Sequence, residues 1–397
     1  MALASLGGRL VLAARSEAKA EALKAQIEAS MSNPGPVSWI ELDLRSLRSV
    51  AAFAQQFAKM SDAGGWPPLK CLVCNAGILN INGRYQATAD GFEETFGVNH
   101  LGHFYLTRLL LPRLRDAAPS RVVYVSSGSH LGSFGTTDIE NSDTLHRLAK
   151  PDEDTRRRFG HRESYGAYCW SKLAMVCMAK SIEAKFGSSG VTAASLHPGS
   201  GVPTSIARQW KVAMWFHQKL ISWFVKDLDQ VTLCHITRNI QLGLPGLLPY
   251  TLWGRTSCSC TASLIAVCSH PALRFVRTLP LYLHAPERLS TAPNCFASFT
   301  QGSSTTLFCC LAEHDELRGR YFNDCAAYPS SDLATPAACE CLWEVSEALV
   351  ARAMIDPRPA DVYIGPSSAL SLASGCGFGK SEVSGTVEVH SPEIRSQ

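Results

Sequence analysis

The sequence lacks an apolar run that is long enough to cross a membrane. Its longest such runs, Cys71–Cys74 and Leu242–Tyr250 among them, fall far short of the roughly 20 residues that a span requires. It also lacks an excess of charge of one sign, because 37 Lys and Arg residues nearly balance 34 Asp and Glu residues to a net charge of +3. We therefore expect no transmembrane helix and no nucleic-acid partner.

The sequence also lacks the signal peptide and the short length that accompany a disulfide scaffold, although it holds 15 cysteines in 397 residues. We expect reduced thiols and a cytoplasmic location. Cys71-Leu-Val-Cys74 has the spacing of a redox or metal site, but strand alternation turns neighbouring side chains to opposite faces, so core packing is favoured. Cys309-Cys310 and Cys339-Glu-Cys341 lack partner spacing for zinc, and no metal site is expected.

Short apolar runs alternate with amphipathic segments along the first half of the sequence. The runs predict strands at 9–14, 37–42, 71–74, 121–126 and 191–197. The segments between them predict helices at 17–30, 47–60, 91–115 and 165–186. This alternation predicts an α/β fold, a doubly wound parallel sheet with helices on both faces. Ligands bind beyond the carboxyl ends of the strands in such sheets.

Polar residues follow the predicted strands at five places, and each alone is more often a turn or a helix cap. They are Arg15-Ser16, Asp43, Asn75-Ala76-Gly77, Ser126-Ser127 and His197-Pro198-Gly199. Tyr168-Cys-Trp-Ser-Lys172 adds a phenol and an ammonium at i and i+4, on one helix face. We expect the ammonium to lower the tyrosine pKa from about 10 toward neutrality, which would make the phenol a usable acid or base.

The order of these motifs resembles the short-chain dehydrogenase/reductase family. The residues of these motifs are similar to those of its retinol dehydrogenase and WW-domain oxidoreductase branch, above all in Phe96-Gly-Val-Asn-His-Leu-Gly-His-Phe104. The resemblance covers residues 1–230, a dinucleotide-binding and catalytic domain, and resumes over 302–354. It implies a Rossmann-like fold and the interconversion of an alcohol and a carbonyl by hydride transfer.

By matching motif, the resemblance implies four catalytic residues. Tyr168 would donate or accept the proton, and Lys172 would lower its pKa while binding the nicotinamide ribose. Ser127, the second of the Ser-Ser pair, would hold the substrate carbonyl oxygen. Asn99 would hold a water that links Lys172 to solvent.

The resemblance also implies the cofactor-binding residues, which are Arg15, Asp43, Asn75, Ala76, Gly77, Tyr168, Lys172, Pro198 and Gly199. Asn75 to Gly77 would pack at the adenosine end, Asp43 would meet the adenine, and Pro198-Gly199 would reach the carboxamide. Arg15 offers a guanidinium where an acid would grip the ribose of NAD(H), and a planar fork suits a phosphate, so NADP(H) is favoured over NAD(H). The alternative is that Arg15 is a solvated residue beside a helix start.

The amino end departs from the family, which opens with a strand and a Thr-Gly-x-x-x-Gly-x-Gly turn that binds the pyrophosphate. This sequence has neither, so we expect the first strand to be missing and its two neighbours to keep unpaired backbone groups. Two hypotheses follow: an NADP(H)-dependent oxidoreductase, or a truncated, catalytically inactive dehydrogenase-like binding protein.

Residues 231–301 contain no Lys, no Asp and a single acid, Glu287, and show no sustained helical or strand period. They are either a substrate lid or non-coding sequence read through in frame, and the second is favoured. The polar stretch 138–163, with Arg156-Arg-Arg158, predicts a surface loop, either simply solvated or an anionic docking patch. Residues 355–397 predict a disordered tail.

Residues 204–225 are rich in large apolar side chains and cover the substrate by resemblance, which predicts a small lipophilic substrate, retinoid-like or steroid-like. Lysines within the segment also allow a helix that lies in a membrane interface, although packing on its own domain is favoured. A peripheral membrane contact and a homo-oligomer are left open.

Overall fold

The computed structural model describes residues 2–32, 34–80, 82–132, 139–199, 265–269 and 299–355. The predicted substrate-covering segment 204–225 and the predicted tail from residue 356 lie outside the described residues.

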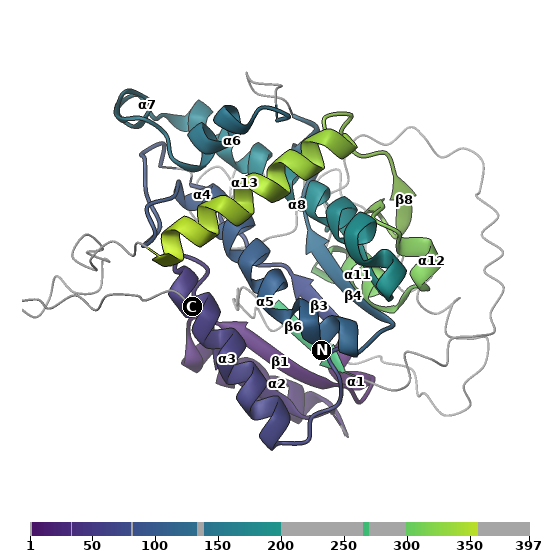
Figure 1. The fold of residues 1–397 in the computed structure, drawn as a ribbon. Helices are drawn as coiled ribbons and strands as arrows, with labels where there is room; N and C mark the ends of the chain where they lie inside the picture. Colours follow the sequence, from purple (N-terminus) through teal and green to yellow (C-terminus); the bar gives the residue numbers. More distant parts are fainter. Residues whose placement is uncertain are drawn as a thin grey trace, which may run out of the picture. The chain divides into compact units, whose positions relative to one another are not determined.

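The described strands form one sheet in the order β2-β1-β6-β3-β4-β5-β7-β8 (Figure 1). Neighbouring strands are parallel except around β6, which is antiparallel to both neighbours, and between β7 and β8. The strands are β1 Arg9–Ala14, β2 Val37–Glu41, β3 Cys71–Cys74, β4 Ser120–Val125, β5 Val191–His197, β6 Ile265–Ser269, β7 Tyr321–Asn323 and β8 Ala326–Tyr328. The predicted doubly wound α/β fold is confirmed.

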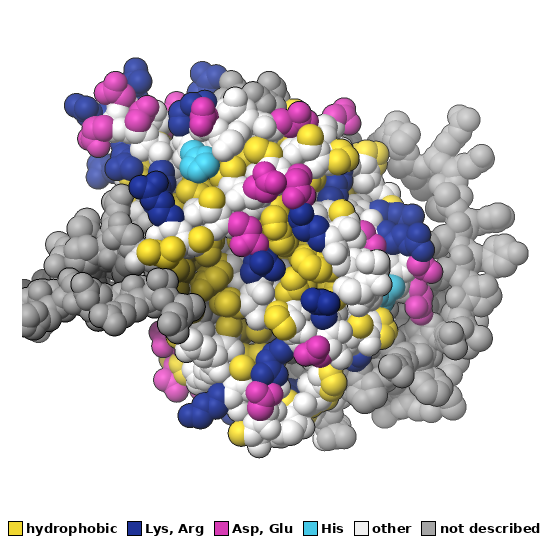
Figure 2. Space-filling model, viewed as in Figure 1, with side chains coloured by type: hydrophobic (Ala, Val, Ile, Leu, Met, Phe, Trp, Pro, Cys, Tyr) yellow, Lys and Arg dark blue, Asp and Glu magenta, His cyan; other side chains and the backbone are white. Residues whose placement is uncertain are grey.

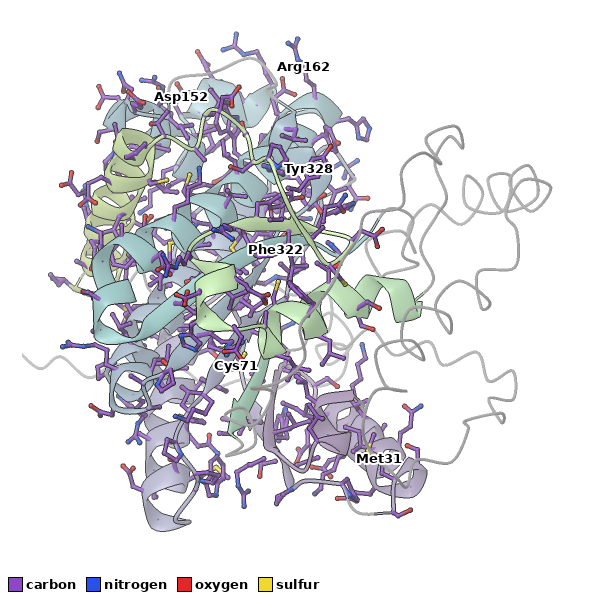
Figure 3. The ribbon with its side chains drawn as sticks, turned by 90° about the vertical axis from the view of Figure 1, so that its right-hand side faces the viewer. Met31, Cys71, Asp152, Arg162, Phe322 and Tyr328 are labelled. Atoms are coloured by element: carbon purple, nitrogen blue, oxygen red, sulfur yellow. The ribbon has the colours of Figure 1, made fainter. Side chains whose placement is uncertain are left out.

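Helices cover both faces of this sheet. The first face carries α3 Leu47–Ala63, α5 Gly102–Asp116, α8 His161–Phe186 and α13 Pro336–Ile355. The second carries α1 Ala2–Ser5, α2 Glu17–Ser30 and α11 Phe299–Leu311, and Figure 3 shows α11 near Cys71 and Phe322 of the sheet. Shorter helices are α4 Glu94–Phe96, α6 Ser142–Ala149, α7 Glu153–Arg157 and α12 His314–Leu317.

Strand alternation divides the core between the two faces. Val11 and Ala13 of β1 pack with the first group of helices, while Leu10 and Leu12 pack with the second. Ser16 then caps α2, since its hydroxyl accepts a hydrogen bond from the Lys19 N–H at 3.4 Å. The strand therefore ends, and the helix begins, at the edge of the sheet where ligands bind.

Ion pairs fasten α13 to the helices beneath it. Arg108 of α5 pairs with Glu347 at 2.5 Å, and Lys185 of α8 pairs with Glu340 at 2.6 Å. Figure 2 shows acidic and basic side chains interspersed over this face of the molecule. Because these pairs are partly exposed, each adds little stability, and burial of the apolar face of α13 contributes more.

The strand at the centre of the sheet differs from two expectations. We expected β1 and β3 to keep unpaired edges and residues 231–301 to show no strand period. Instead β6, which comes from that segment, lies between them (Figure 1), and Val267 pairs with both Val11 and Leu72. The short apolar run Leu264–Cys268 was overlooked within a segment of no regular pattern, and its partners lie far away along the chain.

Two further predictions about local structure are corrected. The single helix expected over 91–115 is interrupted by a π-helical turn, η1 Gly97–Leu101, between α4 and α5. The loop expected over 138–163 contains α6 and α7, capped by the side chains of Asn141 and Asp152. Within it the Arg156 Nε donates to the Pro151 carbonyl at 2.7 Å. Arg157 pairs with Glu153 and Asp154 of the same helix. These local contacts favour a solvated arginine run over an anionic docking patch.

Two buried histidines should make the fold sensitive to acid. Burial lowers the pKa of His100 to about 3 and that of His103 to about 4. In the unfolded chain a histidine has a pKa near 6.5, so below that pH it is protonated while the buried histidine in the folded protein stays neutral. The free energy of unfolding should therefore fall as the pH drops from about 6.5 toward 4. Urea unfolding at pH 7.5 and pH 5.0 should differ by about 2 kcal/mol for each histidine.

A substitution isolates this contribution. His100→Gln keeps a polar group near the Ser346 hydroxyl, which lies 2.8 Å from Nε2, and should reduce the pH dependence by about half of the combined effect. His146→Asn, at an exposed position on α6, is the control and should leave the pH dependence unchanged. An unchanged slope in His100→Gln would show that other groups cause the acid sensitivity.

Candidate active site

Helix α8 and the end of β4 bring three of the predicted catalytic residues together. Tyr168 and Lys172 lie one turn apart on α8 and are only 9 % and 4 % exposed. The side chain of Ser127, just beyond β4, lies close enough to the Tyr168 phenol to lower its pKa. The Lys172 Nζ lies 5.6 Å from the centre of the Tyr168 ring and donates to the Val125 carbonyl at 2.9 Å. The arrangement places a hydroxyl, a phenol and an ammonium around one point.

The pKa values of this pair differ from the prediction. Burial raises the pKa of Tyr168, and the nearby Ser127 side chain offsets only part of that increase. Burial also lowers the pKa of Lys172 to about 8. The prediction that Lys172 brings the tyrosine pKa toward neutrality is therefore wrong for the protein alone, because loss of solvation outweighs the distant ammonium. The phenol is protonated at neutral pH and can act as a proton donor.

The two serines at the end of β4 have different partners. The Ser126 hydroxyl is buried and donates to the backbone carbonyl of Lys172 at 2.7 Å, which ties β4 to α8. The Ser127 hydroxyl accepts from the Ser129 N–H at 3.2 Å, donates to the Ser129 hydroxyl at 3.2 Å and lies near Tyr168. The geometry thus supports Ser127 over Ser126 as the residue that meets a substrate oxygen.

Asn99 connects the helix η1 to the loop after β3. Its Oδ1 accepts from the Ile78 N–H at 2.7 Å, while its Nδ2 donates to the Ile78 carbonyl at 2.9 Å and to Ser171 at 3.0 Å. The side chain is committed to these contacts, so its role in holding a water stays a prediction. A methyl group on Gly77 would approach both Lys172 Nζ, at 3.2 Å, and Asn99 Oδ1, at 3.3 Å. Gly77 therefore keeps this junction open.

The carboxyl ends of β1, β2 and β3 surround a small open hollow of about 90 Å³. Residues that line it include Arg15, Lys19, Asp43, Ala76 and Gly77. Arg15 and Lys19 place two exposed cations at its rim, while Asp43 is half-buried and accepts from the Arg45 N–H at 3.0 Å. The predicted adenosine-end residues therefore meet in one hollow, except Asn75, which is exposed and does not line it.

The end of β5 reaches the other half of the site. Pro198 and Gly199 follow β5, and Gly199 adopts a φ of 100°, a backbone conformation that favours glycine. Neither residue lines the hollow at β1 to β3. His197 instead contacts the turn that holds Ser127, since its Nδ1 accepts from the Gly128 N–H at 3.2 Å. Two neighbouring strand ends are thereby joined beside Tyr168.

The sequence interpretation missed several residues at this site. Lys19 lies four residues after Arg15, in the first turn of α2, a spacing that could have indicated a second cation. Tyr165 lies three residues before Tyr168, and its hydroxyl is 3.3 Å from the Ser129 hydroxyl. His197 was noted only as the start of the His197-Pro198-Gly199 turn, and His130 was not noted at all. No local pattern in the sequence places these two histidines together.

A doubly wound sheet with a buried Tyr-x-x-x-Lys pair on a helix, a serine at the end of an adjacent strand and a hollow at the strand ends defines a protein of the short-chain dehydrogenase class. The family model described as "short chain dehydrogenase" matches residues 1–136. Among the described residues, no group of three or more His, Cys, Asp or Glu side chains could hold a metal ion.

Curated relatives extend this match along the chain. Retinol dehydrogenase 12 of Mus musculus is 31% identical over 346 residues, which cover 87% of this chain and 79% of the relative. The WW domain-containing oxidoreductase of Danio rerio is 30% identical over 89% of this chain and 65% of its own length. Retinol dehydrogenase 13 of Homo sapiens is 37% identical over 197 residues, which cover 50% of this chain and 53% of the relative. The chain belongs to the short-chain dehydrogenase family, in its retinol dehydrogenase-like branch, as the sequence predicted.

The family binds nicotinamide cofactors, and the described residues fit the two ends of such a molecule. The hollow at β1 to β3 offers the cations Arg15 and Lys19 for a phosphate and the acid Asp43 for the adenine, while Lys172 of α8 and Ser127, just beyond β4, would face the nicotinamide end. The middle fits less well, because β6 is antiparallel and brings its first residue, Ile265, to the edge where a parallel strand would end.

No helix among the described residues is both long and apolar enough to cross a membrane.

Proposed function

We propose that this protein is an NADP(H)-dependent oxidoreductase that interconverts an alcohol and a carbonyl on a lipophilic, retinoid-like compound. The arrangement of Ser127, Tyr168 and Lys172 carries this proposal, because it supplies an oxygen-binding hydroxyl, a proton donor and a cation within one buried site. The names of the retinol dehydrogenase relatives support the substrate class.

Each of the three side chains has a separate role in a carbonyl reduction. The bound cofactor supplies the hydride. Ser127 donates a hydrogen bond that orients the carbonyl oxygen, and Tyr168 passes its phenolic proton to the oxygen as negative charge develops there. Lys172 offsets the charge of the remaining phenolate with its ammonium. In the reverse direction, the same phenolate removes the alcohol proton.

Spectroscopic assays of the full chain test this function directly. NADPH should bind, as fluorescence titration would show, and retinal or another apolar aldehyde should increase the rate of NADPH oxidation. Binding without turnover would favour the second candidate, a catalytically inactive binding protein. The antiparallel β6 at the centre of the sheet is the observation that favours this candidate.

Arg15 should set the preference between the two cofactors. Arg15→Ala should raise the Kd of NADPH about 5- to 150-fold, equivalent to about 1–3 kcal/mol, because a charge-assisted contact with the 2′-phosphate is lost. The Kd of NADH should hardly change. Arg162→Ala, at an exposed position in the first turn of α8 (Figure 3), is the control. Equal weakening of both cofactors would show that Arg15 supports the fold instead.

A further inference from the structure

One peptide group beside the proposed active site is held at both of its polar atoms by imidazole rings. This is the peptide that joins Ser127 to Gly128. The carbonyl oxygen of Ser127 lies 2.6 Å from Nδ1 of His130. The N–H of Gly128 donates to Nδ1 of His197 at 3.2 Å. We call these two histidines and the peptide between them the imidazole clamp.

The two hydrogen bonds require different tautomers of the two imidazole rings. A carbonyl oxygen only accepts, so His130 must carry its hydrogen on Nδ1. An amide N–H only donates, so Nδ1 of His197 must be bare and its hydrogen must lie on Nε2. Burial lowers the pKa of both rings; for His130 the hydrogen bond with the Ser127 carbonyl offsets part of this shift and Lys180 adds to it, and for His197 the nearby His130 adds to it. Both rings are therefore neutral at physiological pH.

Packing keeps His130 in place. Its side chain is buried, and its ring lies 4.4 Å from that of Tyr321 on β7, centre to centre. Its Nε2 is buried with no hydrogen-bond partner among the described residues, a cost that phenylalanine would avoid. The ring packing alone does not need a histidine. The Nδ1 contact with Ser127 does.

Gly128 is the point at which the clamp can limit rotation of the peptide. A glycine leaves the preceding peptide comparatively free to rotate, and rotation would change the direction of the Ser127 backbone and hydroxyl. A methyl group at Gly128 would meet only Nε2 of His197, at an ordinary 3.9 Å, so space does not require glycine here. The Ser127 carbonyl also accepts from the backbone N–H of His130 at 3.1 Å, in the 3-10 turn Gly128–Leu131. The clamp therefore adds two side-chain hydrogen bonds to this backbone contact, and the one from the Gly128 N–H to His197 reaches across to β5.

We propose that His130 and His197 are positioning residues that fix the Ser127–Gly128 peptide and, through it, the hydroxyl that lies near Tyr168. The inference rests on the proposed function of Ser127. The clamp joins β4, β5 and β7 around this one peptide, so that the substrate-binding hydroxyl has a fixed direction before any substrate arrives. Reactions of this kind can lose about 100-fold in rate when a group is misplaced by 1 Å.

Matched substitutions separate the hydrogen bonds from the packing. His130→Phe keeps a ring against Tyr321 but removes the donor, and His197→Phe removes the acceptor. Each should lower kcat about 10- to 100-fold, while the Kd of NADPH stays within about twofold of the wild-type value. His130→Asn and His197→Asn place an amide group near the former Nδ1 and should restore much of kcat. His146→Phe, at an exposed site on α6, is the control.

A second rescue tests the freedom of the peptide. Gly128→Ala restricts the backbone without a steric conflict, so adding it to His197→Phe should recover part of kcat. Unchanged kcat in both phenylalanine variants, or equal losses in the phenylalanine and asparagine variants, would overturn the proposal.

Two measurements on the full chain do not depend on turnover. Nitrogen-15 spectra of the imidazoles should show the Nδ1–H form for His130 and the Nε2–H form for His197. Hydrogen exchange of the Gly128 amide should be at least tenfold faster in His197→Phe than in the wild type. If the wild type has no turnover but passes both tests, the proposed function fails and the clamp stands. The opposite tautomers, or unchanged exchange, would overturn the clamp itself.

Discussion

Tyr168→Phe should reduce the turnover of an apolar aldehyde at least 100-fold and leave the Kd of NADPH within about twofold of the wild-type value. The phenol supplies the proton in the transition state and contributes little to ground-state binding, so kcat falls and affinity does not. The variant should fold, because the ring stays and the hydroxyl loses only its contact with Ser127. Steady-state kinetics and fluorescence titration measure the two quantities.

Tyr328→Phe provides the matched control. Tyr328 lies on β8 and is 52 % exposed (Figure 3), so loss of its hydroxyl should leave turnover unchanged. Retention of more than a tenth of the wild-type turnover in Tyr168→Phe would show that another group donates the proton.

Val267→Pro should destabilise the domain by at least about 3 kcal/mol. Val267 is the middle residue of β6 and pairs with Val11 on one side and Leu72 on the other. Proline removes its N–H and cannot be accommodated in the middle of a central strand. Urea unfolding and size-exclusion chromatography should show lower stability and more aggregation, whereas Val267→Thr, which keeps the backbone intact, should have a much smaller effect.

A deletion, compared with Val267→Pro, tests the origin of residues 231–301. If the segment is non-coding sequence read through in frame, a chain that joins Gln230 directly to Gly302 should be more soluble and unfold more cooperatively than the full chain. If β6 completes the sheet, that deletion should resemble Val267→Pro, because β1 and β3 lose a shared neighbour. Transcript sequencing across the Gln230 and Gly302 codons gives an independent answer.

Elements with a clear local pattern were predictable from the sequence. The bounds of β1, α2 and β3 agree with the prediction because each is an uninterrupted apolar run or an amphipathic segment with a cap. Helices α6 and α7 were missed because their charged residues suggested a solvated loop, although Asn141 and Asp152 are helix-capping residue types. Strand β6 was missed although Leu264-Ile-Ala-Val-Cys268 is a short apolar run like that of β3, because the segment around it has no regular pattern; its place between β1 and β3 depends on distant partners.

The site shows the same division between local and distant information. Motif order indicated Ser127, Tyr168 and Lys172, and the structure places them together. The pKa of Tyr168 was predicted in the wrong direction, because burial depends on how α8 packs and not on the i, i+4 spacing. The imidazole clamp was missed because His130 and His197 meet only when β4 and β5 pair.

The position of β6 has a consequence for the order in which the protein can fold during synthesis. Ile265 pairs with Ala13 and Cys74, which leave the ribosome long before it does. At a synthesis rate of about 5–20 residues per second, β3 would wait roughly 10–40 s and β1 roughly 13–50 s for their shared neighbour. Open edges of this kind recruit strands from other chains. The nascent protein therefore passes through a period in which chaperones would determine its yield.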